Sequence, residues 1–175
     1  MTKTPYVVVF AGAQGSSKSI VAHFLSMEFS LPILNRDIIR SEVKEDLFTD
    51  DISEGPALKE FEKRFTDRWQ KTLKNGRSFI LDGSVDRRWG ETKKDLEAAG
   101  YRWFMIDMEL SRSFFEDLFK ATKRQKAIGE LDRYLADHKK FMRAHGDDVT
   151  IKITDDTFGK RVHEAAEGLR SFLRA

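Results

Sequence analysis

The stretch from Tyr6 to Leu25 constrains the fold more than any other part of the sequence. In it an apolar run leads directly into a loop of small residues, and the loop leads into a helical pattern. The loop reads GAQGSSKS over residues 12–19. Small residues let consecutive backbone N–H groups turn toward one anion, and a helix that begins there points its positive end at the same place. The stretch therefore predicts a phosphate-binding loop.

This loop nearly matches the pattern G-x-x-x-x-G-K-[S/T], in which the lysine contacts the β- and γ-phosphates and the hydroxyl binds Mg²⁺. Ser17 stands where the pattern has its second glycine. If that position is left-handed, serine costs about 1–2 kcal/mol there. A plain Gly/Ser-rich turn is the alternative, but the position between a strand and a helix favours phosphate binding. We expect the nucleotide to contact Gly12, Ala13, Gln14, Gly15, Ser16, Ser17, Lys18, Ser19 and Ile20.

Short apolar runs alternate with longer helical patterns along the whole chain. Most of the runs are unbroken, as in strands that are buried on both faces of a parallel sheet. The predicted strands are 6–10, 32–35, 78–82, 102–107 and 149–153. The predicted helices are 18–29, 37–47, 57–75, 86–99, 111–126, 129–145 and 157–174. This alternation predicts one three-layer α/β domain over residues 1–175.

Composition narrows the classes of partner. Lysine and arginine number 31 against 29 aspartates and glutamates, so the total charge does not favour a nucleic-acid binder. The chain has no cysteine, which excludes disulfides and thiolate metal sites and favours a reducing compartment; we expect a cytoplasmic protein. No segment approaches the roughly 18 apolar residues of a membrane span. The histidines show no metal-ligand spacing, and we expect each at the surface or at a helix end; they are His23, His138, His145 and His163.

Further motifs separate the classes of phosphate-loop protein. A GTPase would show D-x-x-G after the third strand and N-K-x-D further on, and neither occurs. Motor-type ATPases carry adjacent acidic residues at the end of an apolar strand, whereas Asp82 stands alone in FILDGS. Residues 31–43 read LPILNRDIIRSEV. With this motif the chain resembles the P-loop kinase superfamily, in particular the branch of phage-type polynucleotide 5′-hydroxyl kinases and zeta-toxin-like kinases.

The resemblance implies a three-layer P-loop NTPase fold, with a parallel five-stranded sheet of order 2-3-1-4-5 and helices on both faces. It also implies that Asp37 is the general base for the acceptor hydroxyl and that Arg40 contacts the acceptor. A helix N-cap is the alternative for Asp37, and a solvated helix charge is the alternative for Arg40. Asp82 is predicted to hold a Mg²⁺-bound water near Ser19, with a helix cap together with Ser84 as its alternative.

A basic segment at residues 119–130 corresponds to the lid that closes on the triphosphate in the resembled family. Lys120, Lys123 and Arg124 lie in it, and Arg124 is the best candidate for a catalytic arginine. A solvated helix face is the alternative for this segment. Arg87, next to Arg88, is predicted to face the acceptor.

The sequence thus predicts an ATP- and Mg²⁺-dependent kinase in which Lys18, Asp37 and Arg124 are catalytic. The expected acceptor is a hydroxyl of a small metabolite, sugar or nucleoside. A 5′-hydroxyl polynucleotide kinase is the second hypothesis, although the near-neutral charge counts against a long nucleic acid. A toxin-type kinase for a nucleotide sugar would use the same site. A nucleotide-binding module without transferase activity is a hypothesis from a different class, because Ser17 departs from the pattern.

Overall fold

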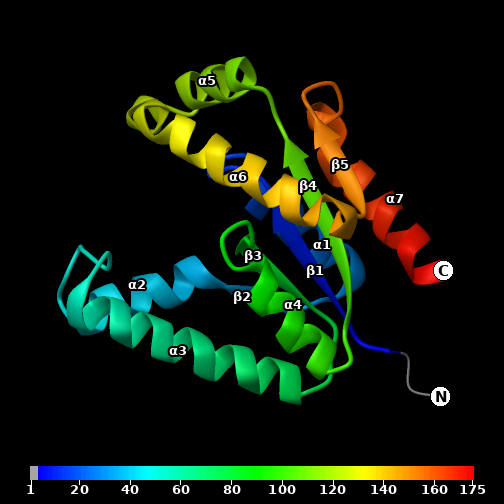
Figure 1. The fold of residues 1–175 in the computed structure, drawn as a ribbon, viewed down its shortest axis with the longest axis horizontal. Helices are drawn as coiled ribbons and strands as arrows, with labels where there is room; N and C mark the ends of the chain where they lie inside the picture. Colours follow the sequence, from blue (N-terminus) through cyan, green and yellow to red (C-terminus); the bar gives the residue numbers. More distant parts are fainter. Residues whose placement is uncertain (1–3) are drawn as a thin grey trace.

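A parallel sheet of five strands forms the centre of the molecule (Figure 1), for which a computed structural model describes residues 4–175. The strands are β1 (Tyr6–Ala11), β2 (Ile33–Asn35), β3 (Phe79–Ser84), β4 (Arg102–Glu109) and β5 (Ile151–Thr154). Their order in the sheet is β2-β3-β1-β4-β5, as expected. Because all neighbouring pairs are parallel, the carboxyl ends of the strands meet at one edge.

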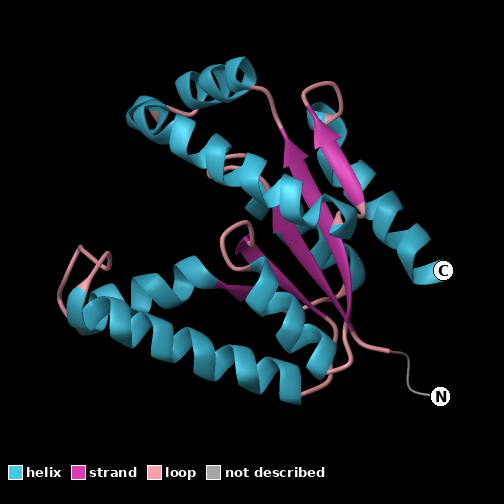
Figure 2. Ribbon diagram, viewed as in Figure 1, coloured by secondary structure: helices cyan, strands magenta, loops and turns pink. Residues whose placement is uncertain are grey.

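Helices follow the strands and cover both faces of the sheet (Figure 2). They are α1 (Lys18–Phe29), α2 (Arg36–Asp46), α3 (Gly55–Lys74), α4 (Trp89–Ala98), α5 (Arg112–Ala121), α6 (Leu131–His145) and α7 (Arg161–Arg174). The expected helix at 111–126 is wrong in length, since α5 ends at Ala121. Lys123 then takes a left-handed φ of 57°, and a short 3₁₀ helix occupies Gln125–Glu130. The chain therefore leaves the helix earlier in the basic segment than the predicted end at residue 126.

The central strand β1 shows why its apolar run is unbroken. Val7 and Val9 pack with residues of α3, α4 and α6 on one face of the sheet. Val8 and Phe10 pack with residues of α1 and α7 on the other face. All four side chains are fully buried. A strand between two helical layers has no polar face, which explains the continuous apolar sequence.

Two helical units extend past the carboxyl edge of the sheet. Helices α2 and α3 pack on each other through Ile39, Val43 and Phe61. Helices α5 and α6 form the second unit, and their apolar cluster includes Ala13 of the loop after β1. Figure 1 shows these two units on different sides of the edge where the strands end.

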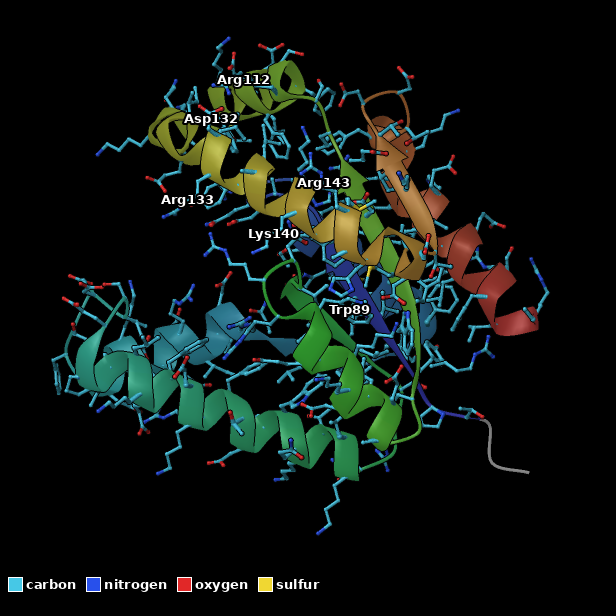
Figure 3. All side chains as sticks on the ribbon, viewed as in Figure 1. Trp89, Arg112, Asp132, Arg133, Lys140 and Arg143 are labelled. Atoms are coloured by element: carbon cyan, nitrogen blue, oxygen red, sulfur yellow. The ribbon has the colours of Figure 1, made fainter. Side chains whose placement is uncertain are left out.

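Helix α6 is polar on the outside. Arg133, Lys140 and Arg143 are exposed along it (Figure 3). On its inner side Phe141 is buried in the core, and the imidazole of His138 stacks on that ring with centroids 6.2 Å apart. Among residues 4–175 no helix is both long and apolar enough to cross a membrane.

Candidate phosphate-binding and acceptor site

The loop between β1 and α1 has left-handed backbone at three positions. Gly12 has φ 115°, Gly15 has φ 89° and Ser17 has φ 68° with ψ 26°. A Cβ at Gly12 would lie 2.9 Å from the Cβ of Met108, and one at Gly15 would overlap the ring of Phe119. Glycine is therefore required at residues 12 and 15 for space as well as for conformation. Ser17 adopts the left-handed conformation that the pattern assigns to glycine.

Lys18 is folded into this loop. Its ammonium group donates to the carbonyl oxygens of Gly12 and Ala13, at 2.9 and 2.7 Å, and to Ser16 Oγ at 2.9 Å. These oxygens carry no net charge, and the side chain is buried. Burial lowers the pKa of Lys18 to about 8. Nearby carboxylates act in the opposite direction, and Asp86 has the largest effect among them. The lysine is thus a desolvated cation that has no anionic partner in direct contact among residues 4–175.

Asp82, on β3, lies beside the first turn of α1. Its carboxylate accepts from Ser19 Oγ at 3.1 Å and from Asn35 Nδ2 at 2.8 Å. Burial raises the pKa of Asp82, and the hydrogen bond from Ser19 opposes that rise. A hydroxyl and a carboxylate in contact are oxygen ligands of the kind that Mg²⁺ prefers. Neither this carboxylate nor Ser84 caps the helix that follows β3.

Asn35 joins Asp82 to helix α2. While its Nδ2 donates to Asp82, its Oδ1 accepts from the backbone N–H groups of Asp37 and Ile38, at 2.7 and 3.2 Å. Asn35 is therefore the N-cap of α2, and the alternative reading of Asp37 as the cap is wrong. The carboxylate of Asp37 is 85% exposed and lies 3.4 Å from the guanidinium of Arg40. Asp37 is thus available to a ligand.

One cavity of about 820 Å³ is lined by most of the predicted site residues. The whole loop from Gly12 to Ile20 lines it, and so do Asp37, Arg40, Asp82, Arg87 and Arg124. The residues come from both helical units, because Leu58 and Phe61 of α3 face the cavity from one side and Leu118 and Tyr134 face it from the other.

Two of the predicted lid lysines do not line this cavity. Lys120 lies 3.3 Å from Asp117 on its own helix, and Lys123 is exposed at the left-handed turn after α5. Arg124 follows that turn and reaches the cavity. Arg87 also lines the cavity, and its guanidinium donates to Asp137 of α6 at 2.8 Å through Nε.

The structure adds an arginine that the sequence prediction left out. Arg36, the first residue of α2, lines the cavity with its guanidinium 4.8 Å from the ring centroid of Phe65 and 5.7 Å from that of Phe61. Burial lowers the pKa of Arg36, and the charges of Arg88 and Arg40 lower it further. Its place inside the N-R-D motif was the available signal.

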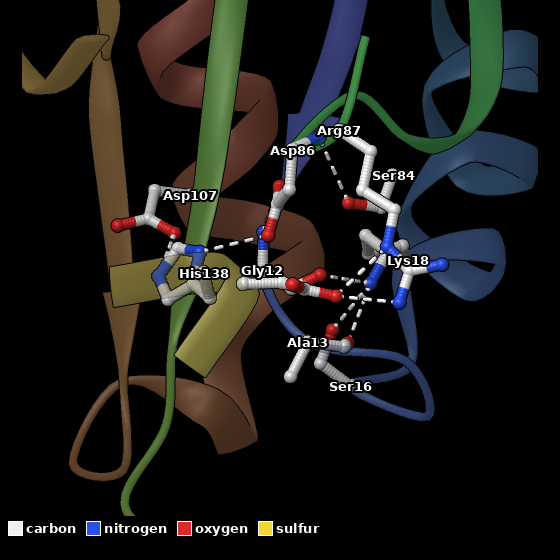
Figure 4. A network of polar contacts seen from close by, with 10 residues as sticks. Gly12, Ala13, Ser16, Lys18, Ser84, Asp86, Arg87, Asp107 and His138 are labelled. Atoms are coloured by element: carbon white, nitrogen blue, oxygen red, sulfur yellow. Dashed lines mark hydrogen bonds and ion pairs between the residues drawn. The ribbon is translucent and has the colours of Figure 1, made fainter. Parts of the chain in front are cut away.

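A buried polar network behind the loop was also missed (Figure 4). Asp86 Oδ1 accepts from the N–H of Gly12 at 3.0 Å, and Asp86 Oδ2 lies 3.0 Å from Nδ1 of His138. Nε2 of the same imidazole is 3.2 Å from Oδ1 of Asp107. The expectation that His138 lies at the surface or at a helix end is wrong, since it sits inside α6 with a side chain only 12% exposed.

The protonation of this network follows from its charges. Burial disfavours the imidazolium, but Asp107 and Asp86 together outweigh that effect and raise the pKa of His138 to about 9. Burial also acts to raise the pKa of Asp86, yet the hydrogen bonds from His138 and its other partners lower it overall. His138 is accordingly charged at neutral pH.

No protein-family model and no curated protein matches the chain. Solved structures do match it. A gluconokinase from Sinorhizobium meliloti 1021 is 19% identical, with a TM-score of 0.63 over 98% of this chain and 95% of that one. A structure from the PezAT chromosomal toxin-antitoxin system of Streptococcus pneumoniae is 15% identical, with a TM-score of 0.65 over 89% and 70%.

The APS kinase of Mycobacterium tuberculosis, in complex with AMPPNP and APS, is 15% identical, with a TM-score of 0.58 over 97% of this chain and 99% of that one. Likeness at these identities concerns the fold. The narrower branch of polynucleotide and zeta-toxin-like kinases stays a prediction. The strand order, the helices on both faces and these matches together show that the chain has the α/β fold of the P-loop kinases.

Proposed function

We propose that this protein is an ATP- and Mg²⁺-dependent kinase that phosphorylates a hydroxyl of a small acceptor carrying an anionic group. The observation that carries the proposal is the shared cavity, in which the phosphate-binding loop faces Asp37 and a group of arginines. The similar structures include a gluconokinase and an APS kinase, which supports phosphoryl transfer to a small molecule.

The triphosphate would bind along the loop. Lys18 would exchange its three neutral oxygen partners for phosphate oxygens, which offer the negative charge that its present partners lack. Ser19 and Asp82 would hold Mg²⁺. Mg²⁺ in such sites keeps several waters and takes phosphate oxygens as further ligands. When bound, the ion neutralises charge on the transferring phosphoryl group.

Asp37 and Arg124 would act on the transfer itself. Asp37 orients the acceptor hydroxyl and takes its proton as the hydroxyl oxygen bonds to the γ-phosphorus. The bond from that phosphorus to the β,γ-bridging oxygen breaks, and ADP leaves with the electron pair. The proton passes from Asp37 to solvent. Arg124, at the opposite wall of the cavity, stabilises the charge on the phosphoryl oxygens during transfer.

The acceptor end of the cavity supports an anionic substrate. Within residues 4–175 Arg36 has no ion pair and rests only on aromatic rings. Arg40 stacks on Phe61 at 5.1 Å and has the exposed Asp37 3.4 Å away, and the carboxylates paired with Arg88 in the described part of the chain are 3.7 and 3.8 Å away. Arg40 and Arg88 both repel Arg36, and an anion beside these guanidinium groups would stabilise them. A carboxylate or phosphate on the acceptor supplies that charge.

The test is a product analysis with Mg·ATP over a panel of hydroxyl compounds: sugar acids, sugar phosphates, nucleoside 3′-monophosphates and their uncharged counterparts. We expect turnover of an anionic member. Asp37→Asn should lower kcat by about 10²–10⁴-fold and leave ATP affinity unchanged. Asp67→Asn, at an exposed position of α3, is the matched control. Arg36→Gln should raise the KM of the acceptor by about 10–100-fold.

Other results would select the alternative functions. Binding of ATP with no transfer, unaffected by Asp37→Asn, would identify a nucleotide-binding module. Acceptor binding that weakens steeply with salt would indicate several phosphates and therefore a polynucleotide end. Preference for uncharged acceptors would contradict the role of Arg36.

A further inference from the structure

The buried network of Asp86, His138 and Asp107 joins three separate parts of the fold to the phosphate-binding loop. Asp86 follows β3, Asp107 lies on β4, and His138 lies on α6. Asp86 bonds to the first glycine of the loop and to His138 at the same time, with one carboxylate oxygen for each (Figure 4). Helix α6 is thereby connected to the backbone of the loop through one carboxylate.

The network is largely buried, and Asp86 lies at the wall of the cavity. The side chain of Asp86 is 6% exposed and that of Asp107 is fully buried. Within residues 4–175 the only ion pair of Asp107 is with His138, and its oxygens accept no aligned hydrogen bond. A buried carboxylate without a counter-charge is strongly unfavourable, and a cation in contact with Asp107 offsets that cost. His138 is the cation in contact.

The charges of the network also affect the electrostatics of the phosphate-binding loop. Asp86 and Asp107 both act on Lys18, the cation that would meet the triphosphate. With a neutral imidazole, Lys18 would be the cation that opposes both carboxylates behind a loop that binds a polyanion. With an imidazolium, one of the two charges is cancelled. The groups that face His138 are Asp86 and Asp107, and Phe141 covers one side of the ring.

We propose that His138 is a positioning residue of the nucleotide site, which as an imidazolium holds Asp86 against the N–H of Gly12 and cancels one carboxylate charge behind the phosphate-binding loop. The inference rests on the proposed nucleotide site. It assigns His138 no contact with substrate, since the residue acts through Asp86 and through charge. Helix α6 also bears Tyr134 and Asp137 at the cavity wall, so the same link ties this wall to the loop.

The test compares His138→Asn with the double variant Asp107→Asn/His138→Asn. The asparagine amide can still donate to Asp86 from the place of Nδ1, but it carries no charge. Calorimetry with Mg·AMPPNP at neutral pH should show affinity lowered by about tenfold in the single variant. The double variant, which also loses one negative charge, should return to within about threefold of the wild type. His163→Asn, at an exposed position of α7, should change nothing.

The outcomes separate this inference from the proposed function. Failure of the wild type to bind Mg·AMPPNP removes the nucleotide site and the inference with it. Wild-type binding that is equally strong in His138→Asn overturns the inference alone. A folded double variant that binds no better than the single variant also overturns it, because a purely structural histidine would not be rescued by removal of a second charge.

A second measurement does not depend on how the variants fold. NMR of the imidazole signals in the wild type should show His138 still protonated at pH 8, and Asp107→Asn should move its titration to lower pH. An imidazole that is neutral at pH 8 in the wild type contradicts the charge compensation on which the proposal depends.

Discussion

Lys18 and His138 are two buried bases on either side of Gly12 (Figure 4), and their surroundings move them in opposite directions. The ammonium of Lys18 donates to two carbonyl oxygens and one hydroxyl oxygen, and its pKa falls to about 8. The imidazole of His138 touches two carboxylates, and its pKa rises to about 9. Both are desolvated, so the charge of the contacting partners decides the direction.

The charge of the contacting partners distinguishes a group that is suited to bind an anionic ligand from a group that is suited to hold the loop in place. A desolvated cation with neutral partners destabilises the ligand-free protein. Such a cation is stabilised most when an anion binds beside it. A cation between two carboxylates is already compensated and gains nothing from a further anion. Lys18 is therefore suited to bind phosphate, and His138 is suited to fix the loop that carries it.

The largest expected effect comes from Lys18→Met, which removes the uncompensated base. We expect kcat/KM for ATP to fall on the order of 10³-fold, because the charge that stabilises the transferring phosphoryl group is lost. The free energy of unfolding should not fall, since the desolvation of the ammonium is removed as well. Steady-state kinetics and denaturant unfolding measure the two quantities. Lys63→Met, at an exposed position of α3, is the control, and a variant that is inactive because it is unfolded would contradict the comparison.

The next effect is the pH dependence of stability. The folded-state pKa of His138 is raised from 6.5 to about 9, so its stabilisation is fully present below pH 6.5 and is lost as pH rises through about 9. The free energy of unfolding of the wild type relative to His138→Asn should fall by about 2 kcal/mol over this pH range. This figure includes a reduction for solvent screening. Urea unfolding from pH 6 to 10 measures it.

Lys18 contributes with the opposite sign over an overlapping range. Its pKa is lowered from 10.5 to about 8, so its unfavourable contribution is present below pH 8 and is relieved as pH rises toward 10.5. The difference between the wild type and Lys18→Met should therefore change in the reverse direction. Equal and parallel pH profiles for the two variants would remove the distinction between the two bases.

The smallest expected effect concerns the backbone beside Lys18. Ser17→Gly relieves a left-handed serine and should raise the free energy of unfolding by about 0.5–1 kcal/mol, after the entropy of glycine in the unfolded chain is included. Ser30, which ends α1 with φ 54°, gives a matched control outside the loop. Thermal unfolding should show a higher free energy of unfolding for glycine at residue 17 and for glycine at residue 30. A loss of stability in Ser17→Gly alone would mean that the hydroxyl of Ser17 stabilises the loop.

The conformation of the glycine-containing loop after β1 and the sheet were predictable because their signals are local. The buried strands are continuous apolar runs, and the loop requires small residues within a short stretch. The sequence also placed Asp37, Arg40 and Asp82 near the carboxyl edge, where the structure puts them in one cavity. The length of helix α5 was mispredicted, because no pattern signalled the left-handed Lys123.

The surroundings of Arg36 could be predicted from the sequence only in part. It lies inside a motif that was recognised, but its stacking on Phe65 and Phe61 depends on how α3 packs against α2. Sequence periodicity predicts that each helix has an apolar face. It does not predict which charged side chain of another helix will contact that face. The anionic character of the proposed acceptor follows from this packing.

By itself the sequence determined the loop, the class of sheet and the candidate carboxylates, because backbone conformation and strand burial depend on neighbours along the chain. Only the tertiary structure decided which charges meet. Asp86, Asp107 and His138 lie far apart in sequence, and the parallel sheet and α6 bring them together behind Gly12. A buried charge takes its protonation state from contacts across the fold, and such contacts leave no local pattern.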